Sequence, residues 1–368
     1  MEKRPLGKTG LDVSVLGFGG FHQVEITSEE SARLLGAYLD AGGNYIETAA
    51  GYGNGISETK IGRAVSHRRR DYILATKSTE RVRAGFLAEL DRSLHNLKTD
   101  HVDVMFMHAV QSVEDMDRIL APDGAMEAAL GARQAGKIRF IAISGHGRPH
   151  ALLNAVHRYR FDLLMTGFNY LDRFNYPAIE GELLPLCAEK GTGVIAMKAL
   201  GDGYLFRSPE PALRYALSLP VATVVAGINS REMLEMDLAF VSRFSPMTEE
   251  EKQELYRTAP ELGDYVCRLC DKCRTPEFDP QKVFLLEGMF DRQMDDMRVG
   301  DAARYALQER LKQWFAQAEL ARSEYRALNP KVDPSRSYRD LSALCPYRID
   351  IDRKLKIAHG KLSPDYIA

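Results

Sequence analysis

Residues 102–108, VDVMFMH, form an apolar run that is interrupted by one aspartate and ends in a histidine. Seven other short apolar runs occur in the first 230 residues, and the runs end about 30 residues apart, the length of one strand–helix unit. They are VLGFGG (15–20), NYIET (44–48), YILATK (72–77), IRFIAIS (138–144), DLLMTGFN (162–169), TGVIAMK (192–198) and VATVVAG (221–227). Parallel strands that are buried on both faces are apolar almost throughout, so this pattern predicts eight parallel strands.

The segments between these runs have the apolar spacing of helices. After the first run, Leu35, Tyr38 and Leu39 recur at helical intervals behind an opening TSEE (27–30), which resembles a helix cap followed by acidic residues. Eight alternating strands and helices predict an α/β protein with a (β/α)8 barrel, or TIM barrel. The stretch 4–13 before the first strand is expected to form a hairpin at the barrel floor.

The length and charge of the chain limit its organisation and its partners. The strand spacing assigns residues 1–245 of the 368 to the barrel and leaves residues 246–368 as a mainly helical C-terminal extension. Lys and Arg total 49 and Asp and Glu total 51, a balance that argues against a nucleic-acid partner. There is no apolar run of about 18 residues and no apolar leader after Met1, so we expect no membrane association and a cytoplasmic protein.

Four polar residues are predicted to meet at one rim of the barrel. Glu47, Lys77 and His108 stand at the ends of three strands, where barrel active sites lie, and Tyr52 follows shortly after the first. An ammonium lowers the pKa of a nearby tyrosine, a carboxylate holds the ammonium, and a histidine polarises a carbonyl. Each residue alone is more simply explained by a structural ion pair or hydrogen bond. Together they predict a site that protonates the oxygen of a ketone or aldehyde as hydride reaches its carbon.

The same residues lie in motifs that resemble a known family. The motifs are ETAAGYG (47–53) followed by SE (57–58), LATK (74–77), and VDV (102–104) followed by His108. They resemble the aldo-keto reductase family, and the resemblance covers residues 1 to about 240. It implies that Tyr52 is the general acid, that Lys77 tunes the pKa of Tyr52, that Glu47 pairs with Lys77, and that His108 orients the substrate. It further implies a small-molecule carbonyl or alcohol substrate and a nicotinamide cofactor, NADP by default and NAD as the alternative.

The resemblance also implies a set of dinucleotide contacts. Ser144 and Asn169 would face the nicotinamide amide, and the loop that starts at Gly227 resembles a phosphate-contacting loop. The residues assigned to this site are Ser144, Asn169, Lys198, Gly201, Gly227, Ser230 and Arg231. Gly201 opens a Gly-Asp-Gly stretch whose backbone amides can approach a pyrophosphate, with a plain surface turn as the alternative.

The sequence departs from the family pattern at four positions. Glu47 replaces an aspartate, and Met165 stands where a glutamine is frequent. Met233 and Asp237 occupy adenine-contacting positions that commonly carry Arg or Gln and then Asn. A carboxylate is unfavourable near a 2′-phosphate. These departures motivate an alternative in which the barrel has lost or altered dinucleotide binding and serves as an electron-transfer or binding module.

Four of the five cysteines lie in the C-terminal extension. Cys267, Cys270 and Cys273 form a C-x2-C-x2-C run, and Cys345 precedes a proline. The run resembles a bacterial-ferredoxin motif, in which the fourth cysteine of each run ligates the other of two clusters. The four cysteines are the complete ligand set of one such cluster, so we predict one 4Fe–4S cluster, with zinc as the alternative. Some aldo-keto reductases carry a ferredoxin-like extension, and this resemblance allows for an electron-transfer protein as a partner.

Two further expectations concern the rest of the sequence. Cys187 lies in an apolar helical segment and is expected to be a packing residue. Residues 302–325, between the two cysteine motifs, are rich in helix-forming residues and predict a helix that Trp314 and Phe315 dock onto the barrel.

Overall fold

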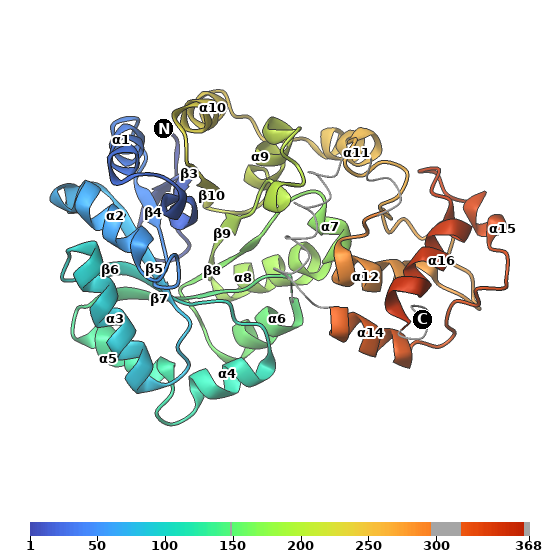
Figure 1. Ribbon diagram of the computed structural model, residues 1–368, viewed down its shortest axis with the longest axis horizontal. Helices are drawn as coiled ribbons and strands as arrows, with labels where there is room; N and C mark the ends of the chain where they lie inside the picture. The colour runs from blue at the N-terminus through green and yellow to red at the C-terminus, as the bar shows by residue number, and fades with distance from the viewer. Residues whose placement is uncertain (148, 296–317, 364–368) are drawn as a thin grey trace. The chain divides into compact units, whose positions relative to one another are not determined.

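The computed structural model describes residues 1–147, 149–295 and 318–363 (Figure 1). These residues form two compact units. The first unit comprises residues 1–168, 178–199 and 213–246, and the second comprises residues 169–177, 200–212 and 247–368. Two segments that follow barrel strands in the sequence, 169–177 and 200–212, therefore group with the C-terminal region.

A closed barrel of eight parallel strands forms the centre of the first unit (Figure 1). The strands are β3 (Leu16–Gly19), β4 (Tyr45–Glu47), β5 (Ile73–Ser78), β6 (Val102–Met107), β7 (Ile138–Ser144), β8 (Leu163–Gly167), β9 (Gly193–Met197) and β10 (Thr223–Gly227). They are hydrogen-bonded in chain order, and β10 closes the barrel by pairing with β3. Each of these eight strands overlaps a predicted apolar run, with β5 extending one residue past its run to Ser78, and the predicted (β/α)8 fold is confirmed.

Helices follow the strands and cover the outside of the barrel (Figure 1). They are α1 (Ser28–Asp40), α2 (Ile56–Val65), α3 (Arg83–Leu97), α4 (Val113–Leu120), α5 (Ala125–Gln134), α6 (Pro149–Arg158), α8 (Leu184–Lys190), α9 (Pro209–Leu217) and α10 (Arg231–Ser242), with short turns η1 (Gly20–Glu25), η2 (Ser66–Asp71) and η3 (Ile179–Leu183). The expected cap of α1 is present, because the Thr27 side chain accepts a hydrogen bond from the Glu30 amide. Leu35, Tyr38 and Leu39 form the buried face of this helix, as their spacing predicts.

The expected N-terminal hairpin is also present. Strands β1 (Lys3–Pro5) and β2 (Asp12–Ser14) pair antiparallel, and Leu6 and Val13 join a buried apolar cluster with residues of the barrel strands. The turn approaches the start of β9 so closely that a Cβ atom on Gly7 would lie 2.6 Å from the Gly193 Cα atom. Gly7 also has a φ of +57°, so only glycine fits this position without strain.

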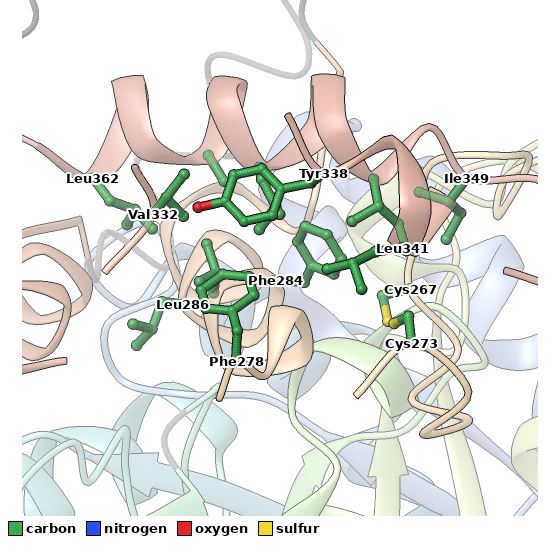
Figure 2. Packing of buried hydrophobic residues seen from close by; sticks show 14 of the residues in the cluster. Cys267, Cys273, Phe278, Phe284, Leu286, Val332, Tyr338, Leu341, Ile349 and Leu362 are labelled. Atoms are coloured by element: carbon green, nitrogen blue, oxygen red, sulfur yellow. The ribbon is translucent and has the colours of Figure 1, made fainter. Parts of the chain in front are cut away.

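The second unit is mainly helical. Its helices are α7 (Asp172–Asn175), η4 (Gly201–Gly203), α11 (Glu249–Thr258), α12 (Pro280–Asp291), α14 (Ala318–Ala327), α15 (Arg339–Ser342) and α16 (Ile351–Leu362). Helix α12 packs against α14 and α16, and Phe284, Tyr338 and Leu355 are among the buried residues of their common core (Figure 2). Of the helix predicted over 302–325, residues 318–325 lie in α14, while Trp314 and Phe315 fall outside the described residues.

A buried group of charged side chains lies beside this core. Glu287 is fully buried and accepts hydrogen bonds from Lys354 (2.7 Å), Lys361 (3.0 Å) and the Tyr265 hydroxyl (2.5 Å). Lys361 also pairs with Asp291 at 2.6 Å. The two ammonium groups neutralise the two carboxylates, as buried charges require. In the described part of the chain, no helix has the length and apolar character needed to cross a membrane.

Candidate active site and cysteine pocket

Lys77 is the centre of the predicted rim site. The side chain is only 1 % exposed, and its ammonium donates hydrogen bonds to the Glu47 carboxylate, to the Thr48 carbonyl oxygen at 2.8 Å and to the Tyr52 hydroxyl oxygen at 3.0 Å. An ammonium has three N–H donors, so these three acceptors satisfy all of them. Burial lowers the pKa of Lys77 well below its usual value.

Strand pairing explains why Glu47 reaches Lys77. Glu47 pairs with Ala75 of the neighbouring strand, and Lys77 lies two residues beyond Ala75, on the same face of the sheet. Glu47 is itself buried. The carboxylate thus contacts the ammonium in spite of the extra methylene relative to the aspartate of the family pattern.

Tyr52 places its hydroxyl group against Lys77 from the loop after β4. The Tyr52 ring packs edge-on against Phe21, at 5.1 Å between centroids, and against His108 at 5.9 Å. From the sequence, the Lys77 ammonium is expected to lower the pKa of Tyr52. Burial instead raises the pKa of Tyr52 above its ordinary value, so the hydroxyl is protonated at neutral pH and holds a proton that it can donate.

His108 follows β6 and faces the same site. Its main-chain N–H donates to the Ser78 carbonyl at 2.8 Å, and its carbonyl accepts from Arg81 at 2.8 Å. Within the described residues, the buried Nδ1 atom of the ring has no hydrogen-bond partner. Burial and the nearby charges of Lys77, His146 and Arg81 hold the pKa of His108 well below its usual value, so the ring is neutral at neutral pH.

Arg81 is a positioning residue that the sequence argument missed. Its guanidinium pairs with Asp115 at 3.1 Å and donates to the carbonyls of His108 and Ala109. Ala109 has a φ of 52°, an unfavourable value for a residue with a Cβ atom. Arg81 therefore helps to fix the backbone that carries the imidazole. A basic residue four positions after the end-of-strand Lys77 was the available sequence signal.

The Ser-Glu pair of the 57–58 motif has a structural role. Ser57 donates to the Gly20 carbonyl at 2.7 Å and lies 2.8 Å from the Thr48 hydroxyl. Glu58 is fully buried and accepts from Thr76 at 2.7 Å. The pair thereby ties α2 to the strands that carry Glu47 and Lys77.

Three of the residues of the barrel unit that were assigned to the dinucleotide lie at the ends of β7, β9 and β10. Ser144 ends β7, and its hydroxyl accepts from the Ala109 amide at 3.3 Å, beside His108. Lys198 directly follows β9 and has a φ of 56°. Gly227 ends β10, and a Cβ atom there would lie 2.4 Å from the His22 ring. A larger residue at this position would displace the partly exposed His22 ring.

The other two residues of this set in the barrel unit begin α10. Ser230 caps the helix by accepting a hydrogen bond from the Met233 amide at 3.2 Å. Arg231 is exposed and pairs with Glu235 at 2.7 Å. On the same helix Asp237 is buried, and burial raises the pKa of its carboxyl to about 7.

Asn169 and Gly201 belong to the second unit, where they lie close together. A Cβ atom on Gly201 would lie 3.6 Å from the Asn169 side-chain oxygen. The Asn169 amide donates to Asp172 at 2.9 Å. Arg292, from the C-terminal region, donates to both Asp172 and Asp202. No local sequence pattern indicated Arg292, because it lies 120 residues away from Asp172.

Comparison with known proteins adds an independent observation to this geometry. The sequence matches the model of the Aldo/keto reductase family over residues 15–211, more than half of the chain. The chain belongs to the aldo/keto reductase family. The predicted assignment to an oxidoreductase family is thereby confirmed.

Individual relatives of this aldo/keto reductase match more than half of the chain. The uncharacterized oxidoreductase YqkF of Bacillus subtilis is 27 % identical over 70 % of this chain and 99 % of YqkF. The L-galactose dehydrogenase of Arabidopsis thaliana is 30 % identical over 57 % of this chain and 69 % of the relative. The structure of the aldo-keto reductase AKR11C1 from Bacillus halodurans, in its holo form, superposes with a TM-score of 0.60 at 29 % identity and covers 69 % of this chain and 95 % of that one.

The aldo/keto reductase chain also carries a pocket lined by all four cysteines of the predicted set. The residues around it are Cys267, Cys270, Cys273, Cys345, Arg268, Lys272, Gln281, Phe284, Tyr347, Ile349 and Ile351. Figure 2 shows Cys267 and Cys273 side by side at the edge of the apolar core. The fifth cysteine, Cys187, is buried in α8, as expected of a packing residue.

Two of the four cysteines of this pocket, Cys267 and Cys273, are buried, and Cys270 and Cys345 are partly exposed. Burial raises the pKa of Cys267 to about 12 and that of Cys273 to about 11. Within residues 1–147, 149–295 and 318–363, no three His, Cys, Asp or Glu side chains have the arrangement of a site for a metal ion. The 4Fe–4S prediction therefore depends on the cysteine motif and on the pocket that the four residues share.

Proposed function

We propose that this protein catalyses NADP(H)-dependent reduction of a small carbonyl compound, or oxidation of the corresponding alcohol, with Tyr52 as the general acid. The observation that carries the proposal is the Lys77 ammonium, which contacts both the Glu47 carboxylate and the Tyr52 hydroxyl oxygen. Proton transfer to an oxygen needs a donor whose conjugate base is stabilised in place. Lys77 is positioned to stabilise the Tyr52 phenolate, and Glu47 fixes Lys77.

The hydrogen-bond directions favour donation toward a substrate. The Tyr52 oxygen accepts from Lys77, so the Tyr52 proton is available to a group on its other side. A neutral His108 carries one ring N–H, which can hydrogen-bond the same carbonyl oxygen and polarise it. When bound, the nicotinamide supplies the hydride for the carbonyl carbon or accepts it from the alcohol carbon.

The residues that would hold the dinucleotide either follow barrel strands or begin helix α10. Ser144 and Asn169 would hold the carboxamide of the nicotinamide, and Lys198, Gly201 and Gly227 would lie along the diphosphate. Ser230 and Arg231 begin the twelve-residue helix α10, whose first amides favour a phosphate group. The NADPH complex of an aldo-keto reductase from Klebsiella pneumoniae, 21 % identical with a TM-score of 0.57, has the same fold.

Calorimetric titration of the purified protein with NADPH and with NADH tests the dinucleotide. Tighter binding of NADPH supports the proposal, and tighter binding of NADH corrects the choice of nucleotide. If neither binds, the alternative of a barrel with lost dinucleotide binding is favoured. The Asp237 carboxyl on α10 is the observation that favours this alternative, because a carboxylate is unfavourable near a 2′-phosphate.

We further propose that Cys267, Cys270, Cys273 and Cys345 hold one 4Fe–4S cluster, through which an electron-transfer protein could exchange electrons with this enzyme. The lining of the pocket supports this proposal, because its four cysteines can supply thiolate ligands and because Arg268 and Lys272 bring positive charge for an anionic cluster. The test is anaerobic purification followed by absorption spectroscopy and metal analysis. Broad absorption near about 400 nm with iron and sulfide supports the cluster, and a colourless zinc protein overturns it.

A further inference from the structure

Arg292 ties together two segments of the second unit that lie 120 and 90 residues before it in the sequence. It lies just after α12 and is almost completely buried. Its guanidinium donates to both oxygens of Asp172, at 3.0 and 3.1 Å, and to Asp202 at 2.8 Å. Both carboxylates are themselves buried, with side chains 8 % and 5 % exposed. Such a planar, charge-assisted arrangement is strongly directional.

Both segments carry a residue assigned to the dinucleotide. Asp172 accepts from the Asn169 amide at 2.9 Å, and the Asn169 oxygen accepts from the Asp172 main-chain N–H at 2.8 Å. Arg292 also lies 3.4 Å from the Gly201 carbonyl oxygen, next to Asp202. One cation of the C-terminal region therefore fixes the orientation of Asn169 and of the Gly201 turn.

The next residue, Gln293, reaches the cysteine pocket. Its side-chain oxygen accepts the main-chain N–H of Cys267 at 2.8 Å. Its amide donates to the Asn175 side chain at 3.1 Å and to the Phe174 carbonyl at 3.3 Å. Gln293 is only 1 % exposed, so these directional bonds are not exchanged with water.

The backbone conformation of this pair is unusual. Arg292 has a φ of 62° and Gln293 has a φ of 55°, which places two consecutive residues with Cβ atoms in the left-handed region. Such conformations are unfavourable and persist only where surrounding contacts hold them. Here the left-handed turn directs one side chain to the Asp172 and Asp202 carboxylates and the next to the Cys267 amide.

We propose that Arg292 and Gln293 couple the cysteine pocket to dinucleotide binding. The inference rests on the proposed function, because it takes Asn169 and Gly201 as dinucleotide contacts. Through this pair, the conformation of the loop at Cys267 sets the positions of Asn169 and of the Gly201 turn. Linkage then requires the converse, that bound dinucleotide orders the loop at Cys267.

Three variants of the holoprotein test this coupling by the dissociation constant for NADPH, measured by calorimetry. Gln293→Leu removes the bonds to Cys267, Asn175 and Phe174 and touches neither Asn169 nor Gly201, while Asp202→Asn weakens the direct contact with Arg292. We expect each to weaken NADPH binding by about tenfold. Tyr325→Phe is the matched control, because it removes a buried hydroxyl that lies 2.7 Å from His359 in the same unit and contacts neither segment. It should leave the dissociation constant within about twofold.

The outcomes separate this coupling from the proposed function. Wild-type protein that binds neither NADPH nor NADH overturns the proposed function and, with it, the coupling. Wild-type protein that binds NADPH, together with an unchanged dissociation constant in Gln293→Leu, overturns the coupling alone. An equal loss in Tyr325→Phe also overturns it, because the loss then reflects general loosening of the unit.

Hydrogen–deuterium exchange of the wild-type holoprotein gives a second test that needs no variant to fold. We expect NADPH to slow amide exchange in peptides that cover 169–175 and 200–203, and also in the peptide that contains Cys267 and Leu269. A peptide from α16 (Ile351–Leu362) should be unchanged. Protection at 169–175 without protection at Cys267 contradicts the coupling.

Discussion

The ammonium of Lys77 donates a hydrogen bond of 3.0 Å to the hydroxyl oxygen of Tyr52. Since the tyrosine oxygen is the acceptor in this bond, its own proton is directed elsewhere. Burial raises the pKa of Tyr52 and lowers that of Lys77, so the pair favours a protonated phenol in this structure. The positive charge of Lys77 stabilises the phenolate that forms when Tyr52 has given up its proton.

Tyr52→Phe should remove the proton donor and little else. We expect kcat for carbonyl reduction to fall by about 10²–10⁴-fold, the usual contribution of a positioned acid. The dissociation constant for NADPH should change by less than about threefold, because the ring and its contacts with Phe21 and His108 remain. Stopped-flow kinetics and calorimetry on the same preparation check both values. Near wild-type kcat in this variant would exclude Tyr52 as the acid.

Lys77→Met should damage both stability and activity. It leaves the buried Glu47 carboxylate without its cation, at a cost of about 3–5 kcal/mol in the free energy of unfolding. The double variant Glu47→Gln/Lys77→Met removes both charges and should recover much of that stability while remaining inactive. Urea unfolding and kcat measurements separate the two effects. If the double variant is no more stable than Lys77→Met, the loss of stability in Lys77→Met does not come from the unpaired Glu47 carboxylate.

His108 should not titrate in the ordinary range of histidine. Its pKa in the folded protein lies well below the usual value near about 6.5, so the ring stays neutral as the pH falls from 8 to 6. We therefore expect kcat of the wild type to show no decrease with an apparent pKa of about 6.5 that is caused by His108. The pH dependence of kcat between pH 8 and pH 6 should then have the same shape in wild type and in His108→Gln. The pH profiles of wild type and variant provide the measurement. A histidine-dependent loss in that window contradicts a neutral, buried His108.

Asp237→Asn should stabilise the protein more at high pH than at low pH. The pKa of Asp237 is raised to about 7 in the folded chain, against about 3.9 when unfolded, so the native state loses stability as pH rises between these values. Asparagine cannot be charged and avoids this loss. We expect a gain of up to a few kcal/mol at pH 8 and a clearly smaller gain at pH 5.5. Equal gains in urea unfolding at both pH values would contradict the raised pKa.

Cys345→Ser should abolish the proposed cluster, because Cys345 is one of its four proposed ligands and lines the same pocket as the other three. We expect the brown colour and about four iron atoms per chain in wild type to be lost or greatly reduced in this variant. Cys187→Ser, at the buried cysteine of α8, is the matched control and should retain both. Iron analysis and absorption spectra after anaerobic purification decide between these results. Equal iron content in wild type and Cys345→Ser would remove Cys345 from the ligand set.

Local sequence pattern predicted most of the barrel and the centre of the site. The eight apolar runs contain the eight barrel strands to within one residue, because a strand buried on both faces admits few polar residues. Glu47, Lys77 and His108 could be placed together because parallel strands end at one rim. Arg81 and Arg292 escaped prediction, because the His108 carbonyl and the Asp172 carboxylate that they contact lie 27 and 120 residues away from them in the sequence.

The sequence by itself determined the (β/α)8 fold and the grouping of Glu47, Tyr52, Lys77 and His108. It also singled out the four cysteines that line one pocket. These features could be predicted because strand periodicity and motif spacing are local properties. Tertiary structure alone decided the protonation of these groups and the partners of the loops. Burial is a property of the packed molecule, and it raises the pKa of Tyr52 where the local charges predicted a decrease. The contacts of Arg292 with Asp172 and Asp202 depend on long-range folding, which brings together segments that are separated by about 90 and 120 residues.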